Sequence, residues 1–582
     1  MPALDEEVSG PPLPEVPFAD VPALIAARAA MDPARVAVRQ RGLNGKLQDL
    51  TWGKLDQRRL ELAAGLLGLG VKPGDRVAVV AQNSAEMLLA ELAILSAGAA
   101  SVPIFPDYAP EVLLHCLNDC GARVAFAGSA VQQHRLAQAK SLQNVIVLDD
   151  QPLPDVGRSL PLKALERAPE ALPAPGETAF VLYTGGTTGK PKGVELTHAN
   201  LLSQQAAMAP LWDVSERDVF LSYLPWHHCF GSLFERFMAL WHRATLVLDD
   251  SRGRDLDKLL ANWAEVKPTV YFGVPRVFAA MAQRARRDAK ARAAVLHAGL
   301  RFVFSAAAPL SAPVFKFFED GGVPVLEGWG LTETSPCVTV TTPRSPRAPG
   351  AVGFPLPGTT VKLKTTEGVP AGRGEALVRG PQVMRGYLGQ PEETARLLES
   401  SGFLHTGDLA EWTAHGLQLH GRVDGVFKLE NGEKVSAGEV EARILAATPL
   451  LEQALALGAG QPFVTALCWI APGPARRYLL ERELDAPQNL RELALVPELR
   501  RAIVEALQAA NLLAGVPYER VRRVALMPDA PSLEAGEVNS TLRLVRPVLE
   551  ERRKELIVAL RDETPNPHIV DIFRRGDPFQ HA

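Results

Sequence analysis

Short apolar runs alternate with segments of helical periodicity along the first two-thirds of the chain. Runs with β-propensity at 77–81, 101–104 and 124–127 are separated by helical patterns at 84–97 and 110–120. This alternation is typical of mostly parallel sheets whose faces are covered by helices. The sequence therefore predicts an α/β protein built around helix-covered sheets.

The pattern changes twice further along the chain. Gly- and Pro-rich turns between short strands indicate a β-rich subdomain at about 345–420, and a smaller α+β pattern follows residue 425. We therefore expect a multidomain α/β chain with a large N-terminal domain and a small, mobile C-terminal domain. The expected units are a flexible lead at 1–20, the large domain at 21–422, the small domain at 423–560 and an exposed tail at 561–582.

Composition excludes some classes of protein. The chain has 582 residues, of which 47% are hydrophobic and 22% charged, and its formal net charge is −4. A dedicated nucleic-acid binder would carry a strong basic excess, so this class is disfavoured. The five cysteines are too few and too scattered for a disulfide framework. We expect His115, Cys116 and Cys120, which lie close together, to pack in the core or on a helix face.

The N-terminus is acidic and Pro-rich, and it lacks the basic and apolar regions of a signal peptide. The longest apolar stretch, at 87–105, is interrupted by Glu91, Gly98 and Pro103, so it suits a core helix followed by a strand better than a membrane span. We therefore expect a cytoplasmic protein. Peripheral contact with a membrane surface stays open.

The stretch 181–195, VLYTGGTTGKPKGVE, is the first candidate site. Glycines let successive backbone N–H groups approach an anion closely, while threonine hydroxyls and lysine ammonium groups add donors and positive charge. The Walker A pattern is excluded because Pro191 follows Gly189 and Lys190. The residues favour binding of a polyphosphate over a plain surface turn.

The stretch 325–336, VLEGWGLTETSP, is the second candidate site. It is not a dinucleotide fingerprint, because Glu333 stands where the last Gly belongs. Trp329 can offer a ring face to a base, and Thr332 can hydrogen-bond a phosphate. Glu333 can bind a hard cation such as Mg²⁺ through oxygen. The combination suits a nucleotide that carries magnesium.

These two stretches resemble motifs of the adenylate-forming superfamily, which includes acyl-CoA synthetases, firefly luciferase and peptide-synthetase adenylation domains. Further resemblance lies in LPWHHCFG at 224–231, LHTGDL at 404–409 and GRVDGVFKLENG at 421–432. The last of these is similar to the AMP-dependent long-chain fatty acyl-CoA ligase branch in particular. The motifs follow the family order over nearly the whole chain. The resemblance implies ATP and coenzyme A as substrates and Mg²⁺ as cofactor.

The resemblance also implies roles for individual residues. Glu333 would bind Mg²⁺, and Asp424 would be the hinge about which the small domain rotates. The residues implied to bind the nucleotide are Thr184, Gly185, Gly186, Thr187, Thr188, Gly189, Lys192, Ala307, Gly328, Trp329, Gly330, Thr332, Asp408 and Arg422. The residues implied to take part in catalysis are Thr187, Lys192, His228, Thr332, Glu333, Lys428 and Arg543.

Several positions depart from the family pattern, and three of them bear most on the chemistry. Gly185 replaces a Ser of the phosphate loop, and Gly425 replaces an acidic residue after the hinge. Arg543 replaces the Lys that reaches the carboxylate and the α-phosphate during adenylation. A planar guanidinium is larger than an ammonium group and does not act as a compact point charge. Arg543 therefore predicts either slower adenylation or altered chemistry.

The resemblance implies an enzyme, an AMP-forming acid–thiol ligase. It would join a medium-to-long-chain fatty acid to AMP and then transfer the acyl group to coenzyme A. Three alternatives stay open. The acceptor could be an acyl carrier protein, the chemistry could be another ATP-dependent carboxylate activation, or the chain could be a pseudoenzyme. The sequence indicates no nucleic-acid partner and leaves the oligomeric state open.

Overall fold

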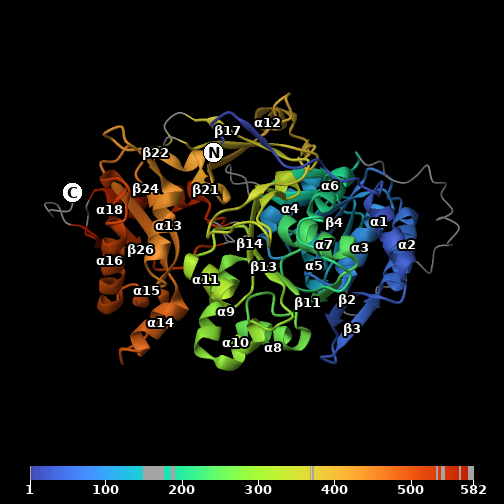
Figure 1. The fold of residues 1–582 in the computed structure, drawn as a ribbon, viewed down its shortest axis with the longest axis horizontal. Coiled ribbons are helices and arrows are strands. Elements are labelled where there is room, and N and C mark those ends of the chain that lie inside the picture. The colour runs from blue at the N-terminus through green and yellow to red at the C-terminus, as the bar shows by residue number, and fades with distance from the viewer. Residues whose placement is uncertain are drawn as a thin grey trace.

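The computed structural model describes residues 2–148, 176–184, 191–366, 369, 372–532, 535–538, 544–562 and 565–573. In these residues a large domain with two sheets carries a β-rich subdomain, and a small domain with its own sheet stands beside it (Figure 1). This is the multidomain α/β architecture expected from the alternating pattern of the sequence.

The first sheet of the large domain has a parallel centre and an antiparallel edge. Strand β8 lies parallel to β5, whereas β8, β9 and β19 pair in antiparallel fashion. The strands in sheet order are β19 (Gly386–Tyr387), β9 (Lys192–Thr197), β8 (Thr178–Thr184), β5 (Ala100–Pro103), β4 (Arg76–Val80), β6 (Val124–Ala127) and β7 (Asn144–Val147). The first candidate site therefore connects two neighbouring strands at the antiparallel edge.

The second sheet has the same plan. Its central strands are parallel, and antiparallel strands close both edges. The strands in sheet order are β16 (Phe354–Pro355), β15 (Cys337–Val340), β14 (Val325–Gly330), β13 (Phe302–Ser305), β12 (Val270–Gly273), β10 (Val219–Ser222), β11 (Thr245–Leu248), β2 (Val36–Arg41) and β3 (Leu47–Thr51). The second candidate site lies at the end of β14.

Helix α3 (Ala85–Ser96) lies in the core between the two sheets, where it contacts β4 and β5 of the first sheet and β2 of the second. Its residues from Ala85 to Leu95 are buried except Glu86, as expected for a helix that is apolar on nearly every side. The other helices of the large domain are α1 (Val21–Met31), α2 (Trp52–Gly68), α4 (Pro110–Cys120), α5 (Ala130–Leu136), α6 (His198–Met208), the π-helix η3 (Phe230–Arg236), α7 (Phe237–His242), α8 (Leu256–Val266), α9 (Pro275–Arg287), α10 (Ala289–Val295) and α11 (Ala312–Asp320).

The β-rich subdomain contains a strand that we expected to be part of a flexible lead. Strand β1 (Glu7–Ser9) pairs antiparallel with β17, and a Cβ atom on Gly10 would lie 2.2 Å from the Leu356 carbonyl oxygen. The expectation was wrong because the partner strand lies some 350 residues away along the chain. The subdomain contains β1, β17 (Thr360–Thr365), β18 (Gly374–Arg379), β20 (Leu404–Thr413), β21 (Gly416–Arg422) and helix α12 (Pro391–Leu397).

The small domain is α+β, and it includes part of the tail that we expected to be exposed. Strand β27 (Ile569–Asp571) pairs with β26 and buries Ile569 and Val570, so the tail expectation was wrong for these residues. The short helix η5 (Val423–Gly425) precedes the first strand of this domain. Its strands are β22 (Val426–Lys428), β23 (Lys434–Ser436), β24 (Leu451–Leu457), β25 (Val464–Ile470), β26 (Val521–Leu526) and β27. Its helices are α13 (Ala437–Ala447), α14 (Pro472–Leu480), α15 (Leu490–Leu493), α16 (Pro497–Asn511), η6 (Pro517–Glu519), α17 (Arg546–Arg552) and α18 (Lys554–Arg561).

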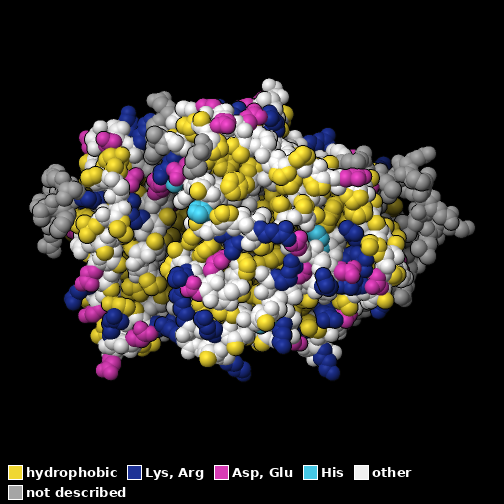
Figure 2. Space-filling view, in the orientation of Figure 1, with side chains coloured by type: hydrophobic (Ala, Val, Ile, Leu, Met, Phe, Trp, Pro, Cys, Tyr) yellow, Lys and Arg dark blue, Asp and Glu magenta, His cyan; other side chains and the backbone are white. Residues whose placement is uncertain are grey.

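Acidic and basic side chains are mixed over the face shown in Figure 2. Within the described ranges, no helix combines the length and apolar character that a bilayer crossing requires. In the same ranges, no group of three or more His, Cys, Asp or Glu side chains is arranged to hold a metal ion. Cys116 and Cys120 of α4 are buried in an apolar cluster, as expected, whereas His115 is half-buried and contacts the Pro191 carbonyl oxygen.

Candidate active site

The base of the first candidate site is a fixed β-hairpin. Thr184 at the end of β8 faces Lys192 at the start of β9. Helix α4 holds both ends of the loop, because the Tyr183 hydroxyl donates to Asp119 over 2.7 Å and a ring nitrogen of His115 lies 3.0 Å from the Pro191 carbonyl oxygen. The loop residues Gly185, Gly186, Thr187, Thr188 and Gly189 lie outside the described residues.

Lys192 and Glu333 lie on either side of Tyr387. The Tyr387 hydroxyl donates a hydrogen bond of 2.7 Å to Glu333 Oε1, and Lys192 Nζ lies 5.4 Å from the centroid of the Tyr387 ring. Lys192 also forms an ion pair with Glu393 of α12. Hydrogen bonds from Arg396 and Lys192 lower the pKa of Glu393 to about 2, so Glu393 is ionised at neutral pH. The structure thus brings the predicted phosphate lysine and the predicted metal ligand together.

A chain of hydrogen bonds links Trp329 to the predicted hinge. The Trp329 indole N–H donates to Asp408 Oδ2 over 2.8 Å, and Arg422 donates to Asp408 Oδ1 over 3.1 Å. Arg422 also contacts Asp424 at 3.4 Å. Burial alone would lower the pKa of Arg422, but the charges of Asp408 and Asp424 outweigh it and raise this pKa. The three residues predicted to contact adenine and ribose therefore form one connected group.

The Trp329 side chain is only 6% exposed, because it packs with Val361 and Trp412 in the hydrophobic cluster of the β-rich subdomain. Stacking of this ring on adenine stays a prediction. The indole N–H has a role that the sequence did not show, since it orients the Asp408 carboxylate. The nearby Gly330 has no room for a side chain, because a Cβ atom there would lie 1.7 Å from the Pro336 carbonyl oxygen.

The segment with two histidines lies against the second candidate site. Cys229 Sγ is 3.3 Å from Thr332 Oγ1, which places the neighbouring His228 on this side of the large domain. His228 Nδ1 accepts a hydrogen bond from the Phe230 N–H. His227 is fully buried beside Phe105, and burial lowers its pKa to about 3, so His227 is neutral. Whether His228 borders the acid stays a prediction.

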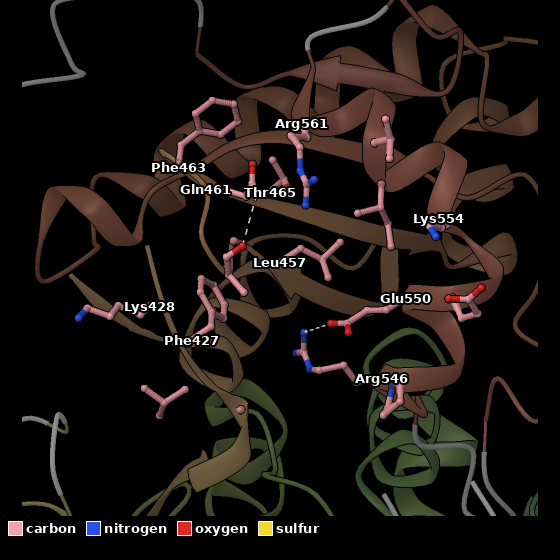
Figure 3. Close-up of a pocket in the computed structure, with 18 of the residues that line it drawn as sticks. Phe427, Lys428, Leu457, Gln461, Phe463, Thr465, Arg546, Glu550, Lys554 and Arg561 are labelled. Atoms are coloured by element: carbon pink, nitrogen blue, oxygen red, sulfur yellow. Dashed lines mark hydrogen bonds and ion pairs between the residues drawn. The ribbon is translucent and has the colours of Figure 1, made fainter. Parts of the chain in front are cut away.

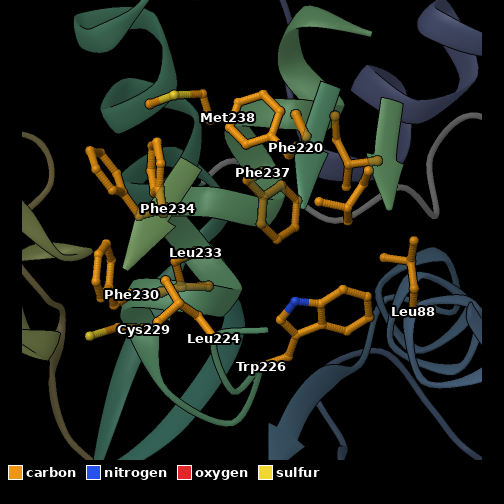
Figure 4. Close-up of a cluster of buried hydrophobic side chains, with 14 of the residues drawn as sticks. Leu88, Phe220, Leu224, Trp226, Cys229, Phe230, Leu233, Phe234, Phe237 and Met238 are labelled. Atoms are coloured by element: carbon orange, nitrogen blue, oxygen red, sulfur yellow. The ribbon is translucent and has the colours of Figure 1, made fainter. Parts of the chain in front are cut away.

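A dense apolar cluster lies behind this segment. Figure 4 shows Trp226 and Phe237 near its centre, with Leu88 of α3 on one side and Phe230 and Phe234 of the π-helix on the other. π-Helical turns are rare and occur often at functional sites. Here the turn follows directly after His228 and Cys229, so the apolar cluster fixes the segment that contacts Thr332.

Two further predicted residues have backbone features that suit a binding site. Ala307 follows β13 with φ +72°, in the left-handed region that non-glycine residues seldom adopt. Such strained positions cluster at binding and catalytic sites. Gly328 in β14 leaves no space for a side chain, since a Cβ atom would lie 2.9 Å from the Phe304 ring. Whether Ala307 and Gly328 contact a nucleotide stays a prediction.

The small domain holds the remaining predicted residues apart from this group. Lys428 in β22 is exposed. It borders a cavity of about 830 Å³ between β22 and helices α17 and α18. Figure 3 shows this cavity with Arg546 and Glu550 paired inside it. Arg543 lies outside the described residues. Among the described residues, the structure thus joins the predicted residues of the large domain by the contacts above, whereas Lys428 lies beside a cavity of the small domain.

Sequence reasoning missed Tyr387 and Glu393. The stretch VMRGYL at 383–388 lies within the range 345–420, whose turns the sequence assigned to a β-rich subdomain. Strand β19 pairs with β9, so the turn carries Tyr387 to Glu333 from a position 54 residues later in the chain. No spacing pattern links these positions, and only the pairing of the strands shows the contact.

The residues present fit a magnesium ion that arrives with a polyphosphate. In the described part of the chain, Glu333 belongs to no group of three or more His, Cys, Asp or Glu side chains arranged to hold a metal. Mg²⁺ is commonly held by one or two carboxylates, with water and substrate phosphates completing its shell. The donor set therefore suits a metal that is shared with a nucleotide rather than one held in a protein cage.

Comparison with known proteins adds three findings. A family model described as "AMP-binding enzyme" matches residues 25–388. The long-chain-fatty-acid–CoA ligase FadD15 of Mycobacterium tuberculosis is 29% identical, over 92% of this chain and 95% of its own length. The peroxisomal long chain acyl-CoA synthetase 7 of Arabidopsis thaliana is 27% identical, over 88% of this chain and 81% of its own length.

Solved structures have the same overall fold. ATP-bound MatB from Rhodopseudomonas palustris matches with a TM-score of 0.74 and 25% identity, over 92% of this chain and 99% of that chain. The anthranilate CoA ligase AuaEII, in complex with anthranoyl-AMP, matches with a TM-score of 0.76 and 22% identity, over 94% of this chain and 99% of that chain. At that identity the second match concerns the fold alone.

Proposed function

Because this chain belongs to the AMP-binding enzyme family, we propose that it is an AMP-forming acyl-CoA synthetase for medium-to-long-chain fatty acids. The two curated relatives described above carry long-chain acyl-CoA synthetase or ligase names and align over most of the chain. The single observation that carries the proposal is the grouping of Lys192, Glu333 and Tyr387 in the same domain as the Trp329–Asp408–Arg422 chain.

The proposed reaction has two steps. In the first, a carboxylate oxygen of the fatty acid attacks the α-phosphorus of ATP, the bond to the β-phosphate bridge breaks, and pyrophosphate leaves. In the second, the thiol of coenzyme A attacks the acyl carbon, gives up its proton, and AMP leaves with the electron pair of the acyl–oxygen bond. Positioning and charge neutralisation carry such phosphoryl chemistry, and no covalent enzyme intermediate is needed.

Each assembled residue has a place in the first step. Lys192 would bind a phosphate of the incoming ATP in exchange for Glu393, and Asp408 would accept hydrogen bonds from the ribose hydroxyls while Trp329 and Arg422 hold it. Glu333 would hold Mg²⁺. When bound, Mg²⁺ neutralises polyphosphate charge. Thr332 and His228 would face the transferred phosphate and the acid.

The second step needs a different arrangement of the small domain. We propose that this domain, from about residue 423, rotates about Asp424 and withdraws Arg543, and that Lys428 then approaches the acyl-adenylate. Hinge motions of this kind are absorbed by a few backbone torsions at element ends. Asp424 lies in the short helix η5 between β21 and β22, as such a hinge requires. We propose a cytoplasmic location, where acid, ATP and coenzyme A meet.

The test uses the purified full-length chain with ATP, MgCl₂, coenzyme A and fatty acids of graded chain length. We expect acyl-CoA thioesters, identified by mass, and exchange of labelled pyrophosphate into ATP that depends on the acid. A parallel reaction offers acyl carrier protein in place of coenzyme A, and we expect little acylation there. Absence of exchange with every acid would overturn the proposal.

A further inference from the structure

Tyr387 connects the two groups that handle the polyphosphate in the proposed function. Its side chain is 7% exposed, its hydroxyl donates to Glu333, and its ring lies beneath the Lys192 ammonium group. We propose that Tyr387 is a positioning residue for adenylation: it orients the Glu333 carboxylate toward Mg²⁺ and fixes the separation of that carboxylate from Lys192. This inference rests on the proposed function.

Glu333 needs an orienting partner because of its place in the fold. It lies in the single-turn helix η4 (Thr332–Thr334), and its side chain is half-buried. Within the described ranges, Tyr387 is the only side chain with a recorded hydrogen bond to the Glu333 carboxylate. A glutamate side chain loses considerable rotamer freedom when it is ordered. Because Tyr387 holds Oε1, the carboxylate is oriented and Oε2 stays available for a metal. The Glu333 side chain is then ordered before the ligand binds, which lowers the entropic cost of binding.

The backbone around Tyr387 is rigid toward both partners. The Met384 N–H donates to the Glu333 carbonyl over 2.8 Å, and the Leu388 N–H donates to the Gly193 carbonyl over 2.8 Å. The segment 384–388 thus joins η4 to β9, the strand that begins with Lys192. The Tyr387 N–H in turn donates to Thr394 Oγ1 over 2.9 Å. The hydroxyl is therefore aimed at Glu333 by main-chain contacts on both sides.

The substitution Tyr387→Phe removes the hydroxyl and keeps the ring. Titration calorimetry with ATP, without acid, measures nucleotide affinity in the presence and absence of Mg²⁺. We expect ATP affinity in the presence of Mg²⁺ to fall about tenfold, because a hydrogen bond to a carboxylate is lost. Affinity in the presence of EDTA should stay unchanged, since the ring beneath Lys192 remains. The Mg²⁺ concentration for half-maximal pyrophosphate exchange should rise with little change in the KM for the fatty acid.

Tyr271→Phe is the matched control. Tyr271 in β12 is fully buried, and its hydroxyl has no hydrogen-bond partner in the part of the chain that the structure describes. Like Tyr387→Phe, this variant loses a tyrosine hydroxyl from the large domain, but not one that contacts Glu333. We therefore expect it to have the Mg²⁺ dependence of the wild type. Thermal unfolding of both variants checks that the fold is kept.

A double-mutant cycle separates positioning from general support. If Tyr387 acts through Glu333, Tyr387→Phe should have little further effect on ATP affinity with Mg²⁺ in a Glu333→Gln background. Additive losses would overturn the proposal, as would Mg²⁺-independent weakening of ATP binding. Thr394→Val is a second test, because it keeps the hydroxyl of Tyr387 but removes the hydrogen bond that holds the Tyr387 backbone. We expect a smaller loss of ATP affinity, seen only when Mg²⁺ is present. If the wild-type protein shows no pyrophosphate exchange with any acid, the proposed function fails. If the wild-type protein is active but Tyr387→Phe has the same Mg²⁺ dependence as wild type, this inference alone fails.

Discussion

The nucleotide group of the large domain and the hinge face of the small domain hold their functional side chains in different ways. In the large domain, Lys192, Glu333 and Asp408 each have a fixed protein partner. In the small domain, Lys428 is exposed and, among the described residues, has no recorded ion pair. Its neighbour across the cavity, Arg546, is paired with Glu441 and Glu550.

This difference matches the order of the proposed steps. The nucleotide must be recognised first, so pre-formed partners lower the entropic cost of ordering the side chains that bind it. In the proposed mechanism Lys428 would act only after the small domain has moved, so a fixed partner in the present orientation would oppose that movement. We infer that the side chains for adenylation, Lys192, Glu333 and Asp408, are ordered before the substrates bind, and we call them the ready half. Lys428, which would serve thioester formation, is not ordered in this way, and we call its side of the small domain the uncommitted half. The predictions below test this contrast.

The largest effect is expected for Glu333→Gln. The amide keeps the shape and one acceptor oxygen but loses the charge that would hold Mg²⁺. Loss of a preorganised electrostatic contact typically lowers a rate by about 100-fold to 1000-fold. We expect such a loss in pyrophosphate exchange, with much smaller loss in acyl-CoA formation from supplied acyl-adenylate. Equal losses in both assays would remove the contrast between the two halves.

Arg543→Lys should act in the opposite direction. A lysine restores the compact charge that the family uses, and errors of about 1 Å in positioning can cost on the order of 100-fold in rate. We expect pyrophosphate exchange to rise, by about tenfold or more, and acyl-CoA formation from supplied acyl-adenylate to change little. Unchanged or slower exchange would show that Arg543 does not occupy the lysine position.

The sequence predicts the sheets of the fold but not the contacts that hold the site together, and the physical reasons differ between residues. Alternation of strand and helix predicted mostly parallel sheets covered by helices, because periodicity is a local property of the chain. The contact between Tyr387 and Glu333 could not be predicted in this way, since it depends on strand β19 pairing with β9 across the chain. The same holds for β1, whose partner β17 is distant in the chain, and for β27, which helices α17 and α18 separate from its partner β26. The indole bond to Asp408 depends on side-chain geometry that no motif encodes.

Lys428→Ala tests the uncommitted half. Because Lys428 has no ion pair with any residue that the structure describes, its loss should leave folding and pyrophosphate exchange close to wild type. Acyl-CoA formation from supplied acyl-adenylate should fall by about tenfold, the size expected when one charged contact to a reacting group is lost. Stopped-flow measurement of AMP release gives this rate directly. A fall in exchange instead would place Lys428 in the adenylation half.

Trp329→Phe tests the ready half with a smaller expected effect than Glu333→Gln. Phenylalanine keeps an aromatic ring but cannot donate to Asp408, which is then held by Arg422 alone. We expect the KM for ATP to rise about fivefold to tenfold, because one hydrogen bond to a charged group is lost. The KM for the fatty acid should not change. Steady-state kinetics with each substrate varied in turn separates the two values, and a shift in the acid KM would contradict the ribose role of Asp408.

The smallest effect concerns the contact that holds the small domain in its present orientation. Glu439 of α13 lies 2.7 Å from Arg373 and 3.0 Å from His420, both on the β-rich subdomain. Burial alone would raise the pKa of Glu439, but the His420 hydrogen bond and the Arg373 charge outweigh it and lower this pKa below 4.5.

A lowered carboxylate pKa contributes stability that is present above the unfolded value and is lost as pH falls through the folded value. Glu439→Gln should therefore destabilise the protein at pH 7, by on the order of 1 kcal/mol after solvent screening. The difference from wild type should shrink once the pH falls below about 4.5, where the unfolded-state glutamate is protonated. Thermal unfolding of both proteins across pH measures the effect. If the uncommitted half rotates as proposed, this variant should also leave pyrophosphate exchange unharmed, since the contact belongs to neither chemical step.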